Sequence, residues 1–263
     1  MKGTIKPNLL DDYHLLSYDE LDSTNDEARR IAEGGGSHGA VIWAREQTEG
    51  RGRMDREWIS EDGNLYVSIL LAPGCDLETC SQLSFVTAVA AVETLEPLLL
   101  QGGELSCKWP NDILLDGKKL GGILLESLET AADEPGDNAL TRWVIVGVGI
   151  NIDNCPDDTD IPATYIKSAG VEIVSAKIVL SRFIHHFITW YDIWSKKGFT
   201  PVRKAWMDYA YGVGEEARVH LPNDTFSGTF DKIDTKGRMI LLEKGGKKRT
   251  ITVGDVFFEE AAG

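Results

Sequence analysis

Three arginines in one short segment are the clearest candidates for chemistry in this chain. Residues 50–58 read GRGRMDREW, with arginines at Arg51, Arg53 and Arg56. A guanidinium group donates forked hydrogen bonds that match a carboxylate or a phosphate, and glycine lets the backbone approach a ligand closely. The spacing fits neither a Walker loop nor a dinucleotide-binding glycine motif. The segment therefore indicates an anion site, and a solvated basic loop is the alternative.

A lysine at the end of an apolar stretch is the second candidate. Residues 108–112 read KWPND, and residues 119–124 read KLGGIL. The Lys108 ammonium could stabilise charge that develops on a transferring phosphate, and Asp112 could hold backbone groups or a metal ion. Glycines within an apolar strand, such as Gly122, suggest that a ligand or another backbone comes close. The alternative is a structural hairpin in which Lys108 extends its amine to solvent.

Two shorter motifs complete the set of candidates. Residues 147–151 read GVGIN, so two glycines and the amide of Asn151 end an apolar stretch. This pattern again suggests close approach of a ligand. Residues 23–25 read STN. Taken alone, Ser23 and Thr24 are as well explained as the N-cap of a helix.

Apolar periodicity predicts the elements that position these motifs. Helices are expected from Ser23 to the glycines at 34–36, over 81–101 with one apolar face, over 175–195 and over 200–209. Strands are expected over 40–44, 65–71, 105–109, 113–115, 120–125 and 143–150, the last of them central in a sheet. Asp116-Gly117 is typical of a hairpin turn. Residues 45–63, 129–141 and 153–164 are expected to be loops.

The pattern changes at about Val213. From there to Phe258, short alternating stretches over 217–221, 226–233, 239–242 and 249–253 are separated by turn residues. Such spacing is typical of a small antiparallel barrel. The sequence therefore predicts a mixed α/β sheet domain over residues 1–212 and a small β-barrel over residues 213–263.

Composition narrows the classes of function. The chain of 263 residues carries 27 basic and 42 acidic residues, a formal net charge of −15, with a pI of about 4.8. This balance argues against a surface that holds nucleic acid, so a local basic cluster points to a small anionic ligand. No run reaches the roughly 18 apolar residues of a membrane span. Four cysteines in no zinc-binding pattern are expected to be reduced thiols, typical of a cytoplasmic protein.

The order of these motifs resembles that of the biotin protein ligases. STN, then QxxGRGRxxRxW, then KWPND with KLGGIL, then GVGIN follow one another from about Leu16 towards the C-terminus. The resemblance implies a mixed sheet with flanking helices, similar to class II aminoacyl-tRNA synthetases, followed by an SH3-like barrel. It implies a ligase that forms biotinyl-5′-AMP from biotin and ATP with Mg²⁺, then transfers biotin to a lysine of a biotin carboxyl carrier domain.

The resemblance also implies roles for individual residues. Lys108 would lie at the reacting carboxyl and α-phosphate, with Arg51 and Arg53 folded over the biotin carboxylate and the phosphates. The ureido head of biotin would meet Ser23, Thr24, Asn25 and Gln47. Main-chain groups at Gly50 and Gly122 would approach the ligand, Trp58 would contact the adenine or the pocket wall, and Asn151 the adenylate. Asp112 is a weaker candidate for a metal ligand.

The chain departs from the family pattern in one position and leaves some alternatives open. Asp55 stands where the family usually has glycine, and aspartate tolerates positive φ better than most residues. The few residues before Leu16 are too short for the DNA-binding domain that some members carry. A lipoate or octanoate ligase of the same fold, and a non-catalytic biotin sensor, are the alternatives to a biotin ligase. The sequence does not distinguish a monomer from a homodimer.

Overall fold

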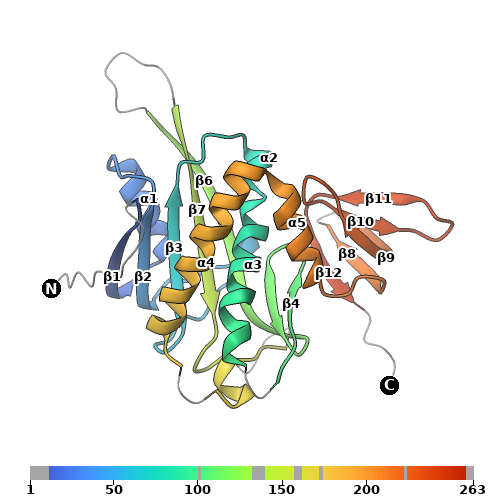
Figure 1. The fold of residues 1–263 in the computed structure, drawn as a ribbon, viewed down its shortest axis with the longest axis horizontal. Coiled ribbons are helices and arrows are strands. Elements are labelled where there is room, and N and C mark those ends of the chain that lie inside the picture. The colour runs from blue at the N-terminus through green and yellow to red at the C-terminus, as the bar shows by residue number, and fades with distance from the viewer. Residues whose placement is uncertain are drawn as a thin grey trace.

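Two β-sheets with helices packed against the larger one make up the structure. The computed structural model describes residues 12–99, 102–131, 140–156, 162–171, 174–221 and 224–258. Figure 1 shows the larger sheet behind two long helices and the smaller sheet at the C-terminal end. None of the described helices is both long enough and apolar enough to cross a membrane.

The larger sheet has seven strands in the order β1-β2-β3-β7-β6-β5-β4. They are β1 (His14–Leu21), β2 (Ala40–Gln47), β3 (Leu65–Leu71), β4 (Leu105–Lys108), β5 (Asp112–Leu115), β6 (Lys118–Ala131) and β7 (Leu140–Ile150). β1 and β2 are parallel and the other neighbours are antiparallel. The expected mixed sheet is therefore confirmed, and β7 is its central strand.

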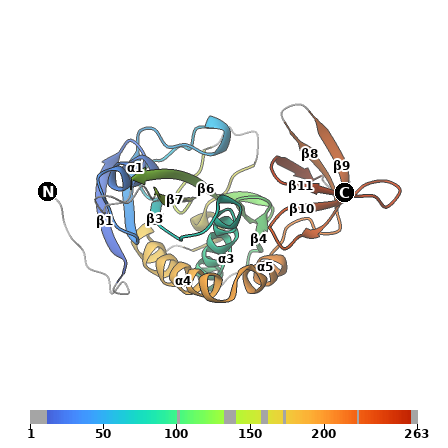
Figure 2. The same ribbon diagram turned by 90° about the horizontal axis from the view of Figure 1, so that it is seen from above.

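Successive apolar side chains of the strands point to opposite faces of the larger sheet, so the sheet has an apolar layer on each face. The helices are α1 (Thr24–Glu33), α2 (Leu77–Cys80), α3 (Leu83–Leu95), α4 (Ala176–Lys197) and α5 (Phe199–Asp208). Val41 and Trp43 of β2 face the core formed with α3 and α4, whereas Ile42 faces Ala28 of α1. Successive side chains of a strand point to opposite faces. Figure 2 accordingly shows α3, α4 and α5 together on one side of the sheet.

The smaller sheet has five antiparallel strands in the order β11-β10-β9-β8-β12. These strands are β8 (Glu216–His220), β9 (Thr225–Ile233), β10 (Met239–Leu242), β11 (Lys248–Ile251) and β12 (Asp255–Phe258). Their alternation places Ala217, Val219, Phe230 and Ile233 in the core. This sheet confirms the expected change from mixed to antiparallel β structure in the last part of the chain.

The two sheets are joined by main-chain and aromatic contacts. The Cys107 N–H of β4 donates to the Tyr209 carbonyl at 2.7 Å, so the chain that leaves α5 continues along the edge of the larger sheet. The indole N–H of Trp109 donates to the Gly237 carbonyl at 2.9 Å. The Phe85 ring lies against Trp206, with ring centroids 5.2 Å apart, and against the backbone of Gly237. The β9–β10 turn therefore packs directly on the core of the larger sheet.

Several expected elements are confirmed and others need correction. The Asp116-Gly117 turn is present, with φ of 50° and 74°, as a type I′ hairpin requires. The helix expected over 81–101 ends as α3 at Leu95, and a 3-10 turn η2 (Glu96–Leu98) follows because proline cannot continue the helical hydrogen bonds. Twelve of its thirteen residues are buried rather than one face, since the helix lies between the sheet and α4.

The remaining corrections concern strand boundaries. The sequence pattern did not predict β1 or β12, which have partly exposed side chains and lie at sheet edges. Residues 129–131 and 140–141 belong to β6 and β7 rather than to a loop. Two segments of the expected loops, 132–139 and 157–161, lie outside the described residues.

Replacing Gly237 by alanine should destabilise the protein more than the same change at Gly246. Both glycines have left-handed φ, 83° and 80°, which costs about 1–2 kcal/mol for a residue with a Cβ. A Cβ at Gly237 would lie 2.6 Å from the Phe85 ring, whereas nothing lies within 4 Å of one at Gly246. We expect a further loss of about 1–3 kcal/mol from overpacking in G237A.

Urea unfolding of G237A, G246A and the unmodified protein, followed by tryptophan fluorescence, measures this difference. Equal free energies of unfolding for the two variants would show that the turn does not pack on Phe85 in solution.

Candidate active site

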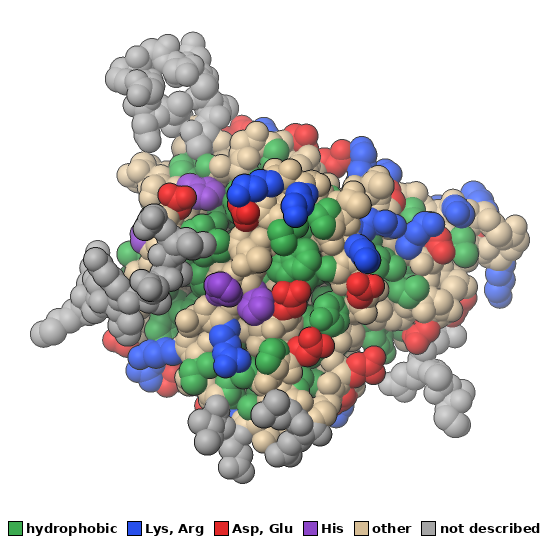
Figure 3. Space-filling model, in the orientation of Figure 1, with side chains coloured by type: hydrophobic (Ala, Val, Ile, Leu, Met, Phe, Trp, Pro, Cys, Tyr) green, Lys and Arg blue, Asp and Glu red, His purple; other side chains and the backbone are tan. Residues whose placement is uncertain are grey.

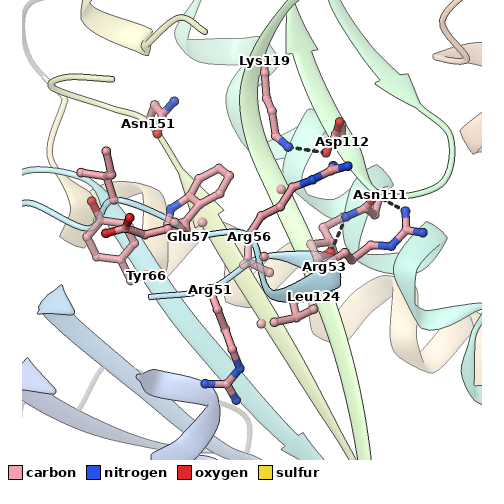
Figure 4. A pocket seen from close by; sticks show the side chains of 18 of the residues that line it. Arg51, Arg53, Arg56, Glu57, Tyr66, Asn111, Asp112, Lys119, Leu124 and Asn151 are labelled. Atoms are coloured by element: carbon pink, nitrogen blue, oxygen red, sulfur yellow. Dashed lines mark hydrogen bonds and ion pairs between the residues drawn. The ribbon is translucent and has the colours of Figure 1, made fainter. Parts of the chain in front are cut away.

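A cavity of about 540 Å³ lies at the ends of the central strands of the larger sheet. Its wall draws on the start of α1, the end of β2, the 50–58 segment, the β4–β5 connection, β6 and β7 (Figure 4). The residues singled out by sequence that line it are Ser23, Thr24, Asn25, Gln47, Arg51, Arg53, Trp58, Lys108, Asp112, Gly122 and Asn151. Four motifs that are far apart in sequence thus meet at one cavity.

Gly50 was also expected to approach the ligand, but it does not line this cavity. A Cβ on Gly50 would lie 2.4 Å from the Ser60 hydroxyl and from the Trp58 carbonyl. The Trp58 N–H donates to the Gly50 carbonyl at 2.9 Å. The glycine is therefore needed to close the base of the 50–58 segment.

One end of the cavity has a floor of buried polar side chains from α1, β2 and β3. Thr24 and Asn25 are 4% and 3% exposed. The Thr24 N–H donates to Gln47 Oε1 at 2.8 Å, and the Ser68 hydroxyl lies 2.7 Å from Thr24 Oγ1 and 2.6 Å from Asn25 Oδ1. Ser23 occupies the N-cap position of α1, but its side chain makes no capping hydrogen bond. Capping therefore does not account for this motif.

Two residues of this floor region were missed by the sequence analysis. Ser68 is fully buried in the middle of β3, and its hydroxyl contacts Thr24 at the start of α1. Glu126 of β6 accepts a hydrogen bond from Asn25 Nδ2 at 2.9 Å. The signal for both was a polar residue inside an apolar run, which buried strands rarely contain without a partner.

Three of the five cations around the cavity have a carboxylate partner. Arg51 binds Asp26 through both terminal nitrogens, at 2.5 and 2.7 Å, and also lies 3.1 Å from Glu126. These hydrogen bonds raise the pKa of the Arg51 guanidinium above its usual range. Figure 4 shows Arg51 directed away from Arg53. The sequence analysis expected the Arg51 side chain to lie over a ligand carboxylate. In this structure it forms an ion pair with Asp26 of α1 instead.

The other two paired cations lie on the opposite side of the cavity. Lys119 Nζ is 2.9 Å from the Asp112 carboxylate, and Arg56 pairs with Asp255 of β12. Asp112 is thus bound to a lysine rather than grouped with other acids. Among the described residues there is no cluster of three or more acidic, histidine or cysteine side chains that could hold a metal ion.

Arg53 and Lys108 are the two cations that lack such a partner among the described residues. Arg53 donates to the Asn111 side-chain oxygen at 3.0 Å and approaches the Gly254 carbonyl at 3.5 Å. Lys108 Nζ lies 5.7 Å from the centre of the Phe257 ring. Burial lowers the pKa of both groups, against the opposing effect of Asp112 and Asp255 beyond ion-pair distance. Two half-buried positive charges therefore face the cavity, and neither has a carboxylate in contact among the described residues.

Trp58 lies flat against the glycines of β6 and β7. A Cβ on Gly149 would lie 2.6 Å from the indole, and one on Gly122 would lie 3.2 Å from it. The Lys119 ammonium is 5.6 Å from the ring centre. The indole N–H is buried and has no hydrogen-bond partner among the described residues. The close approach that the sequence suggested at Gly122 is therefore made by Trp58, whose side chain also lines the cavity.

Asn151 and the 50–58 segment show two further differences from expectation. The Asn151 side chain donates to the Thr164 carbonyl at 3.0 Å, so it anchors the end of the loop expected over residues 153–164. The left-handed residue of the arginine segment is Met54, with φ of 56°. The side chain of Asp55 lies outside the described part of the structure.

The smaller sheet also contributes to the wall, which the sequence did not predict. Asp255, Val256 and Phe257 of β12 line the cavity. Arg53 and Arg56 reach the Gly254 carbonyl and the Asp255 carboxylate across the gap between the sheets. The arginine segment is therefore held between the two sheets.

Comparisons with known proteins agree with this architecture. The model of the biotin/lipoate A/B protein ligase family matches residues 19–151, and that of the biotin protein ligase C-terminal domain matches residues 212–259. A bifunctional ligase/repressor BirA of Bacillus subtilis is 36% identical over 242 residues, which are 90% of this chain and 71% of that protein. A biotin–[acetyl-CoA-carboxylase] ligase of Paracoccus denitrificans is 35% identical over 242 residues, covering 90% and 97%.

A solved structure extends the similarity to three dimensions. The biotin protein ligase from Aquifex aeolicus in complex with biotin and ATP has a TM-score of 0.76 and 27% identity, and the match covers 94% of this chain and 99% of that one. The motifs, the two sheets and these similarities together show that the chain belongs to the biotin protein ligase family.

Proposed function

We propose that this protein is an ATP-dependent ligase that activates biotin as biotinyl-5′-AMP and attaches biotin to a carrier protein. In the first step, a biotin carboxylate oxygen bonds to the α-phosphorus of ATP and pyrophosphate leaves. In the second step, a lysine amine of the carrier bonds to the acyl carbon and AMP leaves with the former carboxylate oxygen. The proton lost by the attacking amine balances the second step.

The observation that carries this proposal is a pair of half-buried cations that have no carboxylate in contact among the described residues. Lys108 and Arg53 lie on the wall of a cavity whose other end is a floor of hydrogen-bonding side chains. A site of this kind fits a ligand with an anionic reacting end and a neutral polar head. Biotin has a carboxylate at one end and a urea ring at the other.

We assign the chemistry to positioning and charge stabilisation. Phosphoryl and adenylyl transfer depend mainly on holding the reactants in line and on stabilising charge at the phosphate oxygens. The Lys108 ammonium and the Arg53 guanidinium are fixed on β4 and between the two sheets. Such pre-oriented groups need little reorganisation as charge develops. In this proposal they contact the biotin carboxylate and the α-phosphate.

The remaining ligand contacts follow from the geometry of the cavity. Thr24, Asn25 and Gln47 would hold the ureido head, and Ser23 would close the floor beside them. The base of the nucleotide would lie against the Trp58 ring, which lines the cavity. Asn151, fixed by the Thr164 carbonyl, supports the adenylate side of the cavity. Arg51 would support the start of α1 rather than contact the ligand, because its guanidinium group is already bound by Asp26 and Glu126.

Magnesium enters the proposal only with ATP. Mg²⁺ is usually held by one or two carboxylates together with substrate phosphates. Asp112, the expected candidate, forms an ion pair with Lys119, and the described residues contain no three-ligand acidic group. The protein side chains alone therefore do not fit a resident metal site, and no step is assigned to a bound ion.

A biotin ligase is favoured over a lipoate or octanoate ligase by the polar floor. The lipoyl and octanoyl tails are apolar, and burying the floor groups against them would leave hydrogen bonds unmade at a cost of about 1–3 kcal/mol each. Thr24, Asn25 and Gln47 instead offer donors and acceptors that a urea can pair with. Pyrophosphate exchange that depends on biotin and not on lipoate tests this choice.

The proposal includes a partner, a location and a division of the chain. The carrier would be the biotin carboxyl carrier domain of an acetyl-CoA carboxylase, the substrate named for the Paracoccus relative. A cytoplasmic location is part of the proposal, because the four cysteines of the sequence follow no disulfide-framework or zinc-binding spacing. We propose residues 1–212 as the catalytic domain and residues 213–263 as a second domain whose β12 completes the cavity.

Nucleic-acid binding is not part of the proposed function. The net charge is −15. The face shown in Figure 3 interleaves basic and acidic side chains rather than gathering the basic ones. A DNA-binding surface normally concentrates lysine and arginine on one face.

Replacing Lys108 by alanine should lower the rate of biotinyl-5′-AMP formation about 100- to 1,000-fold, the usual effect of removing one pre-oriented charge-stabilising group. Biotin-dependent pyrophosphate release measures the rate, and K196A on the exposed face of α4 is the control. Turnover of K108A at the level of this control would contradict the assigned role.

The conservative variant K108R tests whether loss of the positive charge on Lys108 causes the fall in rate at alkaline pH. Because burial lowers the pKa of Lys108, its charge is lost at a lower pH than in free lysine, near 10.4. We therefore expect the rate of adenylation to fall on the alkaline side below that pH. In K108R the fall should move to higher pH, since arginine stays protonated. An unchanged alkaline profile would show that another group is titrating.

Arg53 and Arg51 should give opposite results when each is changed to alanine. R53A removes a cation without a carboxylate in contact, so we expect KM for ATP to rise about tenfold or more with little change in thermal stability. R51A leaves Asp26 and Glu126 without their partner, so we expect a loss of stability of about 1–3 kcal/mol. Enzyme kinetics and thermal unfolding of both variants test this division. Similar losses of ATP affinity and of stability in the two variants would contradict it.

A further inference from the structure

Glu126 of β6 contacts the polar floor from behind and has no role in the reaction described above. Its carboxylate accepts from Asn25 Nδ2 at 2.9 Å and from Arg51 Nη2 at 3.1 and 3.2 Å. Arg29 lies 3.8 Å away. The side chain is 21% exposed and does not line the cavity. Glu126 therefore does not contact a ligand directly but contacts a residue that does.

Glu126 fixes which way the side-chain amide of Asn25 is turned, because its carboxylate is ionised by its pairing with arginine. Such a carboxylate can only accept hydrogen bonds, whereas a hydroxyl such as that of Ser68 can either donate or accept. The Asn25 side chain must therefore turn its NH₂ group to Glu126 and its oxygen to Ser68. It has no room to move aside, because a Cβ on Gly147 would lie 2.3 Å from Asn25 Oδ1.

The orientation of Asn25 decides the direction of the next hydrogen bonds. The Ser68 proton is directed to Asn25 Oδ1 at 2.6 Å. Thr24 must then donate, to Ser68 Oγ at 2.7 Å or to Gln47 Oε1 at 3.1 Å. The orientation of Gln47 is fixed independently, because its oxygen accepts the Thr24 backbone N–H. The groups left for a ligand include the second N–H of Asn25 and a lone pair of Thr24, beside the second N–H of Gln47, whose first goes to Ser60.

We propose that Glu126 is a positioning residue that sets the donor and acceptor directions of the floor, so that Asn25 offers an N–H and Thr24 a lone pair. This pair matches a group that carries a carbonyl next to an N–H, as a urea does. Arg51, held in turn by Asp26, keeps the Glu126 carboxylate in place. The inference rests on the proposed binding of biotin and adds to it the origin of the selectivity for a urea.

The conservative change Glu126→Gln tests this role. A glutamine has nearly the same shape, but it can turn either its oxygen or its NH₂ group to Asn25, so the direction of that hydrogen bond is no longer fixed. We expect the Kd for biotin, measured by calorimetry without ATP, to rise about tenfold, the order expected for one misdirected hydrogen bond. E129Q is the matched control, since it makes the same change in another glutamate of β6 whose hydrogen bonds go to an arginine, Arg142, and not to Asn25 or Arg51. We expect its Kd to stay within about twofold of the unmodified protein.

A double-mutant cycle with N25A distinguishes positioning from a general structural effect. If Glu126 acts through Asn25, E126Q should change the Kd little in the N25A background. Additive effects of the two changes, or equal effects of E126Q and E129Q, would overturn the inference. Glu126→Asp serves the same cycle should E126Q not fold, because it keeps the carboxylate but shortens its reach to Asn25. Failure of the unmodified protein to bind biotin would instead refute the proposed function.

Discussion

The burial of two positive charges is the constraint on which the site depends. An ion taken out of water loses solvation worth several kcal/mol unless a partner replaces it. Around the cavity, Arg51, Arg56 and Lys119 each have a carboxylate in contact. Lys108 and Arg53 have only an amide oxygen, a carbonyl and an aromatic ring within reach among the described residues. Packing elsewhere in the fold must offset this cost until an anionic ligand binds.

The two sheets share the task of holding these charges. Lys108 ends β4 at the edge of the larger sheet, and the ring beside it comes from β12 of the smaller one. The arginine segment begins near β2 and reaches across to Gly254 and Asp255. Packing of the Gly237 turn on Phe85 and its hydrogen bond from Trp109 hold the two sheets in a fixed position relative to each other. The shape of the cavity therefore depends on an interface that lies outside it.

Sequence patterns predicted the strands and helices well where burial was one-sided or complete. The strand over 65–71 and the hairpin at Asp116-Gly117 are present as expected. β1 and β12 were missed because edge strands with mixed polar side chains carry a weak alternation. The helix over 83–95 was assigned one apolar face, since a sequence does not show how many layers will cover a helix.

For the site, motifs identified which residues meet but not how they pair. The resemblance to a known family placed Thr24, Lys108 and Asn151 around one ligand, and the structure has all three on the wall of one cavity. It could not show that Asp26 and Glu126 bind Arg51, because ion pairs between distant segments leave no local pattern. The same limit applies to Ser68, Glu126 and the contribution of β12.

The cavity wall runs from Ser23 to Phe257, which has a consequence for the newly made chain. Domains generally fold as they emerge, N-terminal part first. The polar floor and the β4 lysine can take shape early, whereas the aromatic wall next to that lysine must wait for β12. During synthesis the half-built pocket stays open to water on that side. Adenylate made at that stage would be exposed to hydrolysis, so a closed pocket requires that both sheets have formed.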